Sequence, residues 1–143
     1  MKLHYRKAGA DDVPALAEMN LELIRDEGSR NPMTLNELAG RMTDWLERGE
    51  YVAWLLCDGD ETIGYALCQH QERGSEVYLR QYLIRQSYRR RGCGLEGIHL
   101  LREQFAGISL SIDVLDGNVR GRRFWAKAGF VPYSIRMRLD PPQ

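Results

Sequence analysis

The spacing of apolar residues changes along the chain and predicts which segments form strands and which form helices. Alternation over residues 3–7 is typical of a half-buried strand, and the β-rich runs at 51–57 and 62–68 also indicate strands. Apolar residues three or four positions apart over 13–25 indicate an amphipathic helix. The expected order of elements is β-α-α-β-β-β-α-β-α-β. Helices are expected at 13–25, 34–49, 95–105 and 118–128, and strands at 3–7, 51–57, 62–68, 76–84, 108–115 and 130–139.

Turn and cap residues mark several boundaries between these elements. Asp58-Gly59 lies between two strand-like runs and is a strong hairpin signal. Thr34 and Glu37 have the spacing of a capping box at the start of a helix. No repeat, low-complexity tract or interdomain linker interrupts the order, so we expect one α/β domain over residues 1–143.

The strand at 76–84 is expected to have two unlike faces, because side chains alternate across a strand. One face is mostly apolar and carries Val77, Leu79, Gln81 and Leu83. The other is amphipathic and carries Glu76, Tyr78, Arg80 and Tyr82. The first face predicts core packing, and the second predicts a surface that can meet a ligand.

Composition narrows the classes of function. With 143 residues, of which 43% are hydrophobic, the chain can bury the core of one ordinary domain. Its 20 basic residues balance 20 acidic ones, which disfavours bulk binding of nucleic acid. No apolar run approaches the roughly 20 residues that span a bilayer, so no membrane insertion is expected.

The cysteines indicate a reducing compartment. Cys57, Cys68 and Cys93 are widely spaced and odd in number, which suggests neither a disulfide framework nor a zinc site. The three histidines show no ligand spacing either. We therefore expect a cytoplasmic protein that binds no metal.

A glycine-rich turn follows the strand at 76–84. Gly92 and Gly94 can take positive φ and let a ligand approach the backbone, and the run Arg89–Arg91 precedes them. The helix expected after the turn offers free N–H groups and the positive end of its dipole. Together these features predict a phosphate site. A solvated run of charges is the simpler alternative.

The same turn satisfies a dinucleotide fingerprint, Gly92-x-Gly94-x-x-Gly97, with Asp113 about 20 residues further on. In a Rossmann unit the strand runs almost directly into the first glycine, whereas residues 85–91 intervene here. The chain after the turn is also short for a doubly wound sheet and a substrate domain. These two departures disfavour a dinucleotide.

Two motifs stand after the strand at 76–84. The first reads Ile84-x-x-x-Tyr88-Arg89-x-x-Gly92-x-Gly94, and the second reads Asn118-x-x-Gly121-x-x-Phe124-Trp125-x-x-x-Gly129-Phe130. Together they resemble the signatures of the GCN5-related N-acetyltransferases (GNAT), with Gly121 for the usual Ala and Trp125 for the usual Tyr. The resemblance covers residues 76–133 in detail. It implies a mixed, mostly antiparallel sheet that splays between its fourth and fifth strands and is flanked by about four helices.

By this resemblance, acetyl-coenzyme A lies in the gap of the splayed sheet and on the turn. The pantetheine arm would bond to the backbone of Leu83, Ile84 and Arg85, because splayed strands leave ladder groups that need partners. The pyrophosphate would bind at Arg89, Arg90, Arg91, Gly92, Cys93, Gly94 and Leu95. The second motif would add Asn118, Phe124 and Trp125, although Asn118 is also expected to cap a helix.

The resemblance also implies groups for acetyl transfer to an amine. The backbone N–H of Ile84 would polarise the thioester carbonyl, and Glu76 or Tyr78 stands near the place of the family's base. Trp125 replaces the tyrosine that usually protonates the leaving thiolate, and an indole N–H is too weakly acidic for that role. We therefore expect Trp125 to pack passively while solvent supplies the proton.

The sequence thus predicts an acetyl-coenzyme A-dependent N-acetyltransferase whose acceptor is a small-molecule amine. A non-catalytic acyl-coenzyme A sensor on the same fold is the alternative, and a nucleic-acid binder is a third class that the neutral charge disfavours. We expect a monomer or a homodimer, with edge pairing through residues 130–139 as a route to the dimer. Asp26 and Glu27 would favour a cationic acceptor, whereas Arg80 would favour one that carries a carboxylate.

Overall fold

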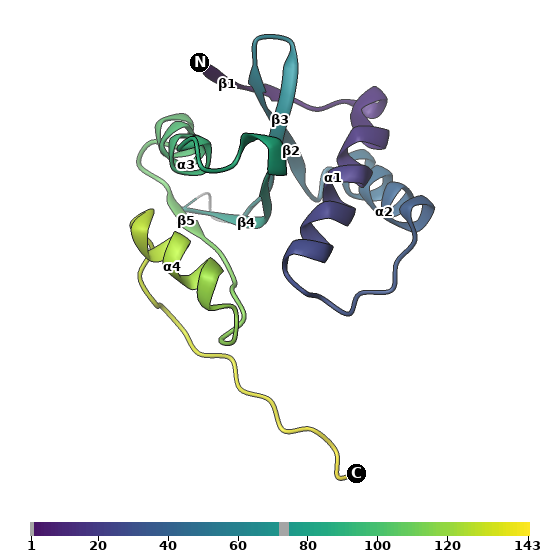
Figure 1. Cartoon of the computed structure of the whole chain (residues 1–143), viewed down its shortest axis with the longest axis vertical. Helices are drawn as coiled ribbons and strands as arrows, with labels where there is room; N and C mark the ends of the chain where they lie inside the picture. Colours follow the sequence, from purple (N-terminus) through teal and green to yellow (C-terminus); the bar gives the residue numbers. More distant parts are fainter. Residues whose placement is uncertain (1, 72–74) are drawn as a thin grey trace. The chain divides into compact units, whose positions relative to one another are not determined.

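The computed structural model describes residues 2–71 and 75–143 and divides into two compact units, Met1–Asp113 and Val114–Gln143. The first unit contains a five-stranded sheet in the order β1-β2-β3-β4-β5. All neighbouring strands are antiparallel except β4 and β5, which confirms the mixed sheet (Figure 1). The strands are β1 (Leu3–Lys7), β2 (Val52–Asp58), β3 (Glu61–His70), β4 (Glu76–Ile84) and β5 (Ser109–Ser111).

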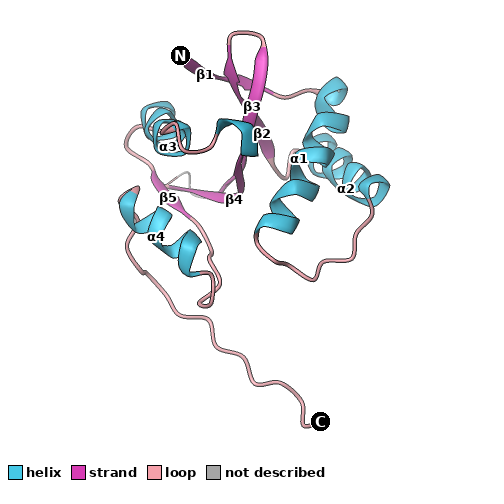
Figure 2. Cartoon of the chain, in the orientation of Figure 1, coloured by secondary structure: helices cyan, strands magenta, loops and turns pink. Residues whose placement is uncertain are grey.

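The four predicted α-helices are present in the described part of the chain (Figure 2). The first unit holds α1 (Val13–Asp26), α2 (Leu35–Glu47) and α3 (Cys93–Gln104), with 3-10 turns at η1 (Ala10–Asp12) and η2 (Gln86–Tyr88). The second unit holds α4 (Val119–Lys127). The capping box of α2 is confirmed, because Thr34 and Glu37 exchange hydrogen bonds between side chain and backbone.

Helices cover both faces of the sheet in the first unit (Figure 1). The core under α1 and α2 includes Leu16, Met19, Met42, Leu55, Tyr65 and Leu67. A smaller core on the face of α3 comprises Leu3, Leu56, Ile63 and Cys93. The sheet therefore separates the α1–α2 layer from α3, and any site at its edge can draw residues from both layers.

A β-bulge in β4 redirects its side chains. The register with β3 shifts between Leu67 and Cys68, where Arg80 is the extra residue. Arg80 donates a hydrogen bond to Tyr51 in the α1–α2 layer, whereas the hydroxyl of Tyr82 donates to a carbonyl of α3. The prediction that Arg80 and Tyr82 share one face is therefore wrong, because one inserted residue shifts the alternation.

Close contact between α3 and the sheet depends on Gly97. The hydroxyl of Tyr5 donates to the carbonyl of Gly97 at 3.0 Å. A Cβ on Gly97 would lie 2.1 Å from the hydroxyl oxygen of Tyr82. The third glycine of the fingerprint-like run therefore serves helix-to-sheet packing here.

The end of the chain departs most from the sequence prediction. β5 forms but is shorter than the strand predicted at 108–115. No strand forms at 130–139, so the prediction of a strand there is wrong (Figure 2). Alternation gives a segment the propensity to be a strand, but a strand also needs a neighbour with which to pair. The alternating apolar side chains are all exposed, namely Val131, Tyr133, Ile135, Met137 and Leu139.

Candidate active site

The ladder between β4 and β5 ends while β4 still continues. β5 pairs only with the first three residues of β4, up to the pair of Tyr78 and Ser111, whereas β4 runs to Ile84. The strands therefore splay beyond Tyr78, as predicted. From there to Ile84 no other described strand pairs with this edge of β4, so an extended ligand can use it.

Ile84 presents its backbone to this open edge. The N–H of Arg85 donates to the carbonyl of Ile63 in β3 at 2.8 Å. Because successive residues of a strand direct their N–H groups to opposite edges, the N–H of Ile84 points away from β3. Leu83 and Arg85 direct theirs toward β3. Of the three positions expected to meet the pantetheine arm, Ile84 is the one whose N–H lies at the open edge.

Gly64 of β3 lets β4 lie close at this point. Gly64 pairs with Ile84, and a Cβ on Gly64 would lie 2.2 Å from the carbonyl oxygen of Leu83. Any larger residue would push the end of β4 away. No motif in the sequence marks Gly64, because its role depends on a strand that is distant along the chain.

The turn after η2 has an unusual backbone. Arg90 has φ of 64° and Gly92 has φ of 78°, and Arg90 is the one non-glycine residue in the described chain with positive φ. Left-handed residues on either side of Arg91 resemble the alternation in anion-binding nests. The N-cap residue of α3, Gly92, has no side chain that could cap the helix, and α3 begins directly after the turn. Arg90 and Arg91 are exposed, and the Arg91 guanidinium lies 5.3 Å from the ring centroid of Tyr88.

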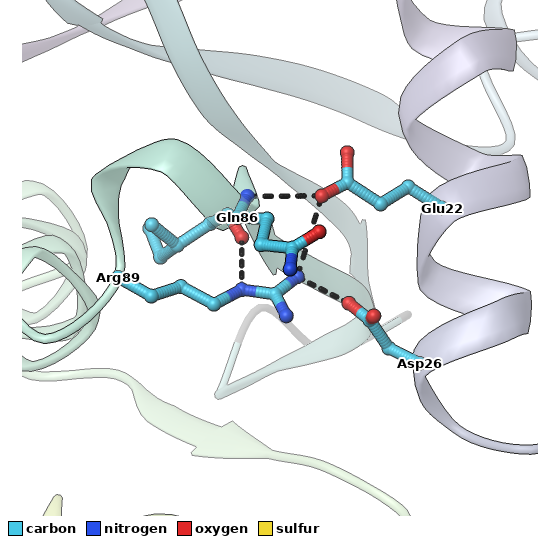
Figure 3. A network of polar contacts seen from close by, with 5 residues as sticks. Glu22, Asp26, Gln86 and Arg89 are labelled. Atoms are coloured by element: carbon cyan, nitrogen blue, oxygen red, sulfur yellow. Dashed lines mark hydrogen bonds and ion pairs between the residues drawn. The ribbon is translucent and has the colours of Figure 1, made fainter.

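Arg89 connects this turn to α1 (Figure 3). Its Nε donates to the carbonyl of Ile84 at 2.9 Å. Its Nη2 forms an ion pair with Asp26 and a longer one, of 3.4 Å, with Glu22. Glu22 also accepts the backbone N–H of Gln86 at 2.9 Å. The side chain that was expected at the pyrophosphate is thus held by two carboxylates and the end of β4.

The first residue of α3, Cys93, directs its side chain into the molecule. The thiol of Cys93 is buried in the core on this face, and burial raises its pKa, so it stays protonated at neutral pH. The carbonyl of Gly94 accepts a hydrogen bond of 2.7 Å from Tyr82, which ties the turn to β4. Leu95 is half-buried. A contact from Cys93 to a ligand would therefore come from its backbone.

A cavity of about 530 Å³ lies beside the end of β4. It is lined by Glu18, Glu22, Arg25, Asp26, Arg85, Gln86 and Ser87. These residues come from α1 and from the segment that follows β4. The volume suits a small ligand, and the cavity adjoins the acidic partners of Arg89.

Tyr78 and Asp113 meet where the strands separate. The hydroxyl of Tyr78 donates to Oδ2 of Asp113 at 2.8 Å. Burial, together with this bond and the charge of Asp113, raises the pKa of Tyr78 to about 12, so the phenol stays protonated at neutral pH. Glu76 lies at the start of β4, half-buried and paired with Ser109. Asp113 is a carboxylate at this point that the motifs did not assign to catalysis.

The second unit holds the residues of the downstream motif. The side chain of Asn118 accepts the N–H of Gly121 at 3.0 Å, which confirms that Asn118 caps α4. Trp125 packs edge-to-face against Phe124 and Phe130, with ring centroids 4.9 Å and 5.1 Å away. These rings form an aromatic cluster within the unit.

Over residues 2–71 and 75–143, no group of three or more His, Cys, Asp or Glu is arranged to hold a metal ion. Every helix within these ranges is too short or too polar to cross a membrane. The three cysteines are buried thiols.

Residues 16–130 match the model of the acetyltransferase (GNAT) family. The chain also resembles "a possible acetyltransferase" from Clostridium difficile 630, at 13% identity and a TM-score of 0.79, over 100% of this chain and 99% of that one. A "predicted acetyltransferase with acetyl-CoA" from Clostridium acetobutylicum is 18% identical, with a TM-score of 0.72, over 97% and 96% of the two chains. An acetyltransferase from Thermus thermophilus is 22% identical, with a TM-score of 0.76, over 92% and 88%. At these identities the likeness shows a shared fold.

Proposed function

Because the chain belongs to the acetyltransferase (GNAT) family, we propose that it moves the acetyl group of acetyl-coenzyme A to the amine of a small molecule. Residues 1–143 act as one catalytic domain in this proposal. All the proposed site residues come from one chain, so a monomer or a homodimer satisfies it equally.

The proposed donor site runs from the end of β4 to the start of α3. The N–H of Ile84 lies at the open edge, where it can donate to an amide of the pantetheine arm or to the thioester oxygen. The turn with Arg90 and Gly92 in the left-handed region suits a pyrophosphate, and the N-cap position of α3 is a glycine, which has no side chain to cap the helix. Arg90 and Arg91 add exposed positive charge. Acetyl-coenzyme A supplies the activated acetyl group when bound.

Asp113 is the proposed proton acceptor for the attacking amine. Its carboxylate lies at the point where β4 and β5 separate, and the hydroxyl of Tyr78 holds one of its oxygens. Tyr78 keeps its own proton, because its pKa is about 12, so it orients Asp113 and does not compete for the proton. Glu76 is a second carboxylate nearby on β4, and it remains the alternative base.

No acid is assigned to the leaving thiolate. Trp125 stands in the motif position of the usual tyrosine, and its indole N–H does not ionise usefully near neutral pH. A thiolate of ordinary pKa can leave and take its proton from solvent. Trp125 contributes packing against Phe124 and Phe130 in this proposal.

One observation carries the proposal, namely that β4 continues to Ile84 after its ladder with β5 has ended at Tyr78. The test is release of free coenzyme A thiol from acetyl-coenzyme A across a panel of amines. Acceptor-dependent release is expected. For Asp113→Asn, kcat should fall about a hundredfold. Asp11→Asn, an exposed control, should leave it unchanged.

A non-catalytic acyl-coenzyme A sensor is the second candidate. It is favoured by Tyr78 and Trp125, which replace the carboxylate and the phenol expected of the family. Tight binding of acetyl-coenzyme A by calorimetry, with no amine in the panel accelerating thiol release, would select the sensor and exclude the enzyme.

The identity of the base is tested separately with Glu76→Gln. If this variant lowers kcat about a hundredfold and Asp113→Asn does not, the base is Glu76.

A further inference from the structure

Two arginines share one tryptophan ring in the α1–α2 layer. The guanidinium carbon of Arg41, on α2, lies 4.5 Å from the ring centroid of Trp45. That of Arg80, on the bulge of β4, lies 4.9 Å from the same centroid and 5.6 Å from the ring of Tyr51. Arg80 lies at the bulge of β4 and faces this layer. Two positive charges thus lie against the same aromatic ring. Their mutual repulsion costs free energy unless an anion binds between them.

Neither arginine has a carboxylate partner in the described chain. Arg41 donates to the amide oxygen of Asn20 at 3.2 Å, and Arg80 donates to the hydroxyl of Tyr51 at 3.1 Å. Both acceptors are neutral, and no ion pair joins either arginine to a described Asp or Glu. The Nε of Arg41 is buried, and no described residue accepts its proton. A partly desolvated guanidinium without a counter-charge lowers the stability of the folded state, which suggests that the pair has a binding role.

Two carboxylates of α1 are engaged elsewhere, because Glu22 and Asp26 hold Arg89. Desolvation and the charge of Asp26 raise the pKa of Glu27, and no ion pair joins Glu27 to Arg41 or Arg80. Burial and the charge of the exposed Arg80 lower the pKa of Arg41, as expected for two like charges close together. Glu22 and Asp26 are therefore already paired with Arg89, and neither is paired with Arg41 or Arg80.

We propose that Arg41 and Arg80 form a subsite for a carboxylate of the acceptor, so that the acceptor is an amine that carries a carboxylate. This inference rests on the proposed function. Guanidinium forks match both oxygens of a carboxylate, and Trp45 holds the two side chains in place. Arg80 stands two residues, roughly 7 Å of strand, from Tyr78, which orients Asp113. One strand thus supplies both the anion contact and the link to the proton acceptor.

The test compares amines that differ only in the carboxylate. Glycine, β-alanine, γ-aminobutyrate and L-lysine are each paired with the corresponding carboxamide, which removes the charge and keeps the shape. Binding is measured by calorimetry without acetyl-coenzyme A, and kcat/KM is measured with it. At least one carboxylate should bind about tenfold to a hundredfold more tightly than its carboxamide. A preference in kcat/KM cannot come from reactivity, because the carboxamide lowers the pKa of a neighbouring amine and favours turnover.

Arg80→Gln should abolish this preference, and Arg80→Lys should keep part of it. Arg102→Gln on the exposed side of α3 is the matched control and should leave it intact. If Arg80→Gln fails to fold by circular dichroism, Arg80→Lys still reports on the bidentate contact. Equal binding of every pair, or no binding of any carboxylate, overturns the subsite even where turnover is seen. A preference in binding that depends on Arg80 supports it even where no turnover is seen, and then the proposed function alone fails.

Discussion

The hydroxyl of Tyr78, which belongs to the last ladder pair of β4 and β5, donates a hydrogen bond to the carboxylate of Asp113, two residues after the end of β5. The bond thereby fixes the side chain of Asp113 at the mouth of the splay. Tyr78→Phe keeps the ring and removes the bond. We expect kcat to fall about tenfold, because Asp113 loses a charge-assisted hydrogen bond that orients it. KM for acetyl-coenzyme A should change little, and a rise in that KM with unchanged kcat would contradict the role in orientation.

The same bond predicts how stability depends on pH. The pKa of Tyr78 is raised from 10.0 to about 12 in the folded chain, so the folded state holds this proton more tightly than the unfolded state. The contribution is fully present below pH 10 and is lost as pH rises toward 12. Urea unfolding at a series of alkaline pH values should show stability falling across this window. Tyr78→Phe should make the fall less steep, and an unchanged slope would contradict the assignment.

Gly97→Ala should destabilise the chain by about 1–3 kcal/mol, because the added Cβ would meet the Tyr82 hydroxyl at 2.1 Å. The loss arises although alanine is the better helix former. In a Tyr82→Phe background the clashing oxygen is gone, so the cost of Gly97→Ala should be smaller. Thermal melts of the two single variants and the double variant measure the coupling, and additive effects would argue against the clash.

The elements whose patterns are local were predicted well from the sequence. β4 has the predicted bounds, and the capping box at Thr34 formed as its spacing implied. The bulge at Arg80 was missed, because one inserted residue leaves the alternation of the sequence looking regular. The strand predicted at 130–139 was wrong because its alternation says nothing about a partner. The hydrophobic pattern shows that a segment can form a strand, but whether the strand forms depends on a neighbouring strand with which it can pair.

Gly64→Ala should cost at least about 2 kcal/mol, because the Cβ would meet a backbone oxygen of β4 at 2.2 Å and the backbone cannot turn aside. It should also weaken binding of acetyl-coenzyme A, since the end of β4 at Ile84 must move. Gly40→Ala is the matched control in α2, where a Cβ meets nothing within 4 Å, and should stabilise by about 0.5–1 kcal/mol. Calorimetry and urea unfolding read the two effects. If Gly64→Ala leaves the affinity for acetyl-coenzyme A unchanged, Ile84 is not part of the donor site.

Glu22 and Arg89 should be energetically coupled. Glu22→Ala removes both the ion pair with Arg89 and the acceptor for the N–H of Gln86, so it should cost about 1–2 kcal/mol. The double variant with Arg89→Ala should cost less than the sum of the single variants by about 0.5 kcal/mol or more. Urea unfolding of all four proteins gives the cycle. Full additivity would mean that the contacts of Figure 3 do not act together.

The candidate site was predicted in part, and the division follows sequence distance. The glycine turn and the cap at Asn118 are local, so their spacing was enough to find them. The bond between Tyr78 and Asp113 and the ion pair between Arg89 and Asp26 join residues far apart in the chain. These two contacts can be recognised only once the fold is known, because no sequence motif links the two residues of either pair.

The left-handed backbone at Arg90 sets two demands on this enzyme against each other. A residue with a Cβ at φ of 64° costs about 1–2 kcal/mol relative to glycine in the same place. If the turn binds the proposed donor, a backbone shape that is already formed lowers the entropy cost of that binding. Selection for heat resistance alone would therefore favour glycine at this position, and selection for tight donor capture would oppose it. The φ angle of Arg90 therefore affects both the stability of the fold and, in the proposed function, the binding of the donor.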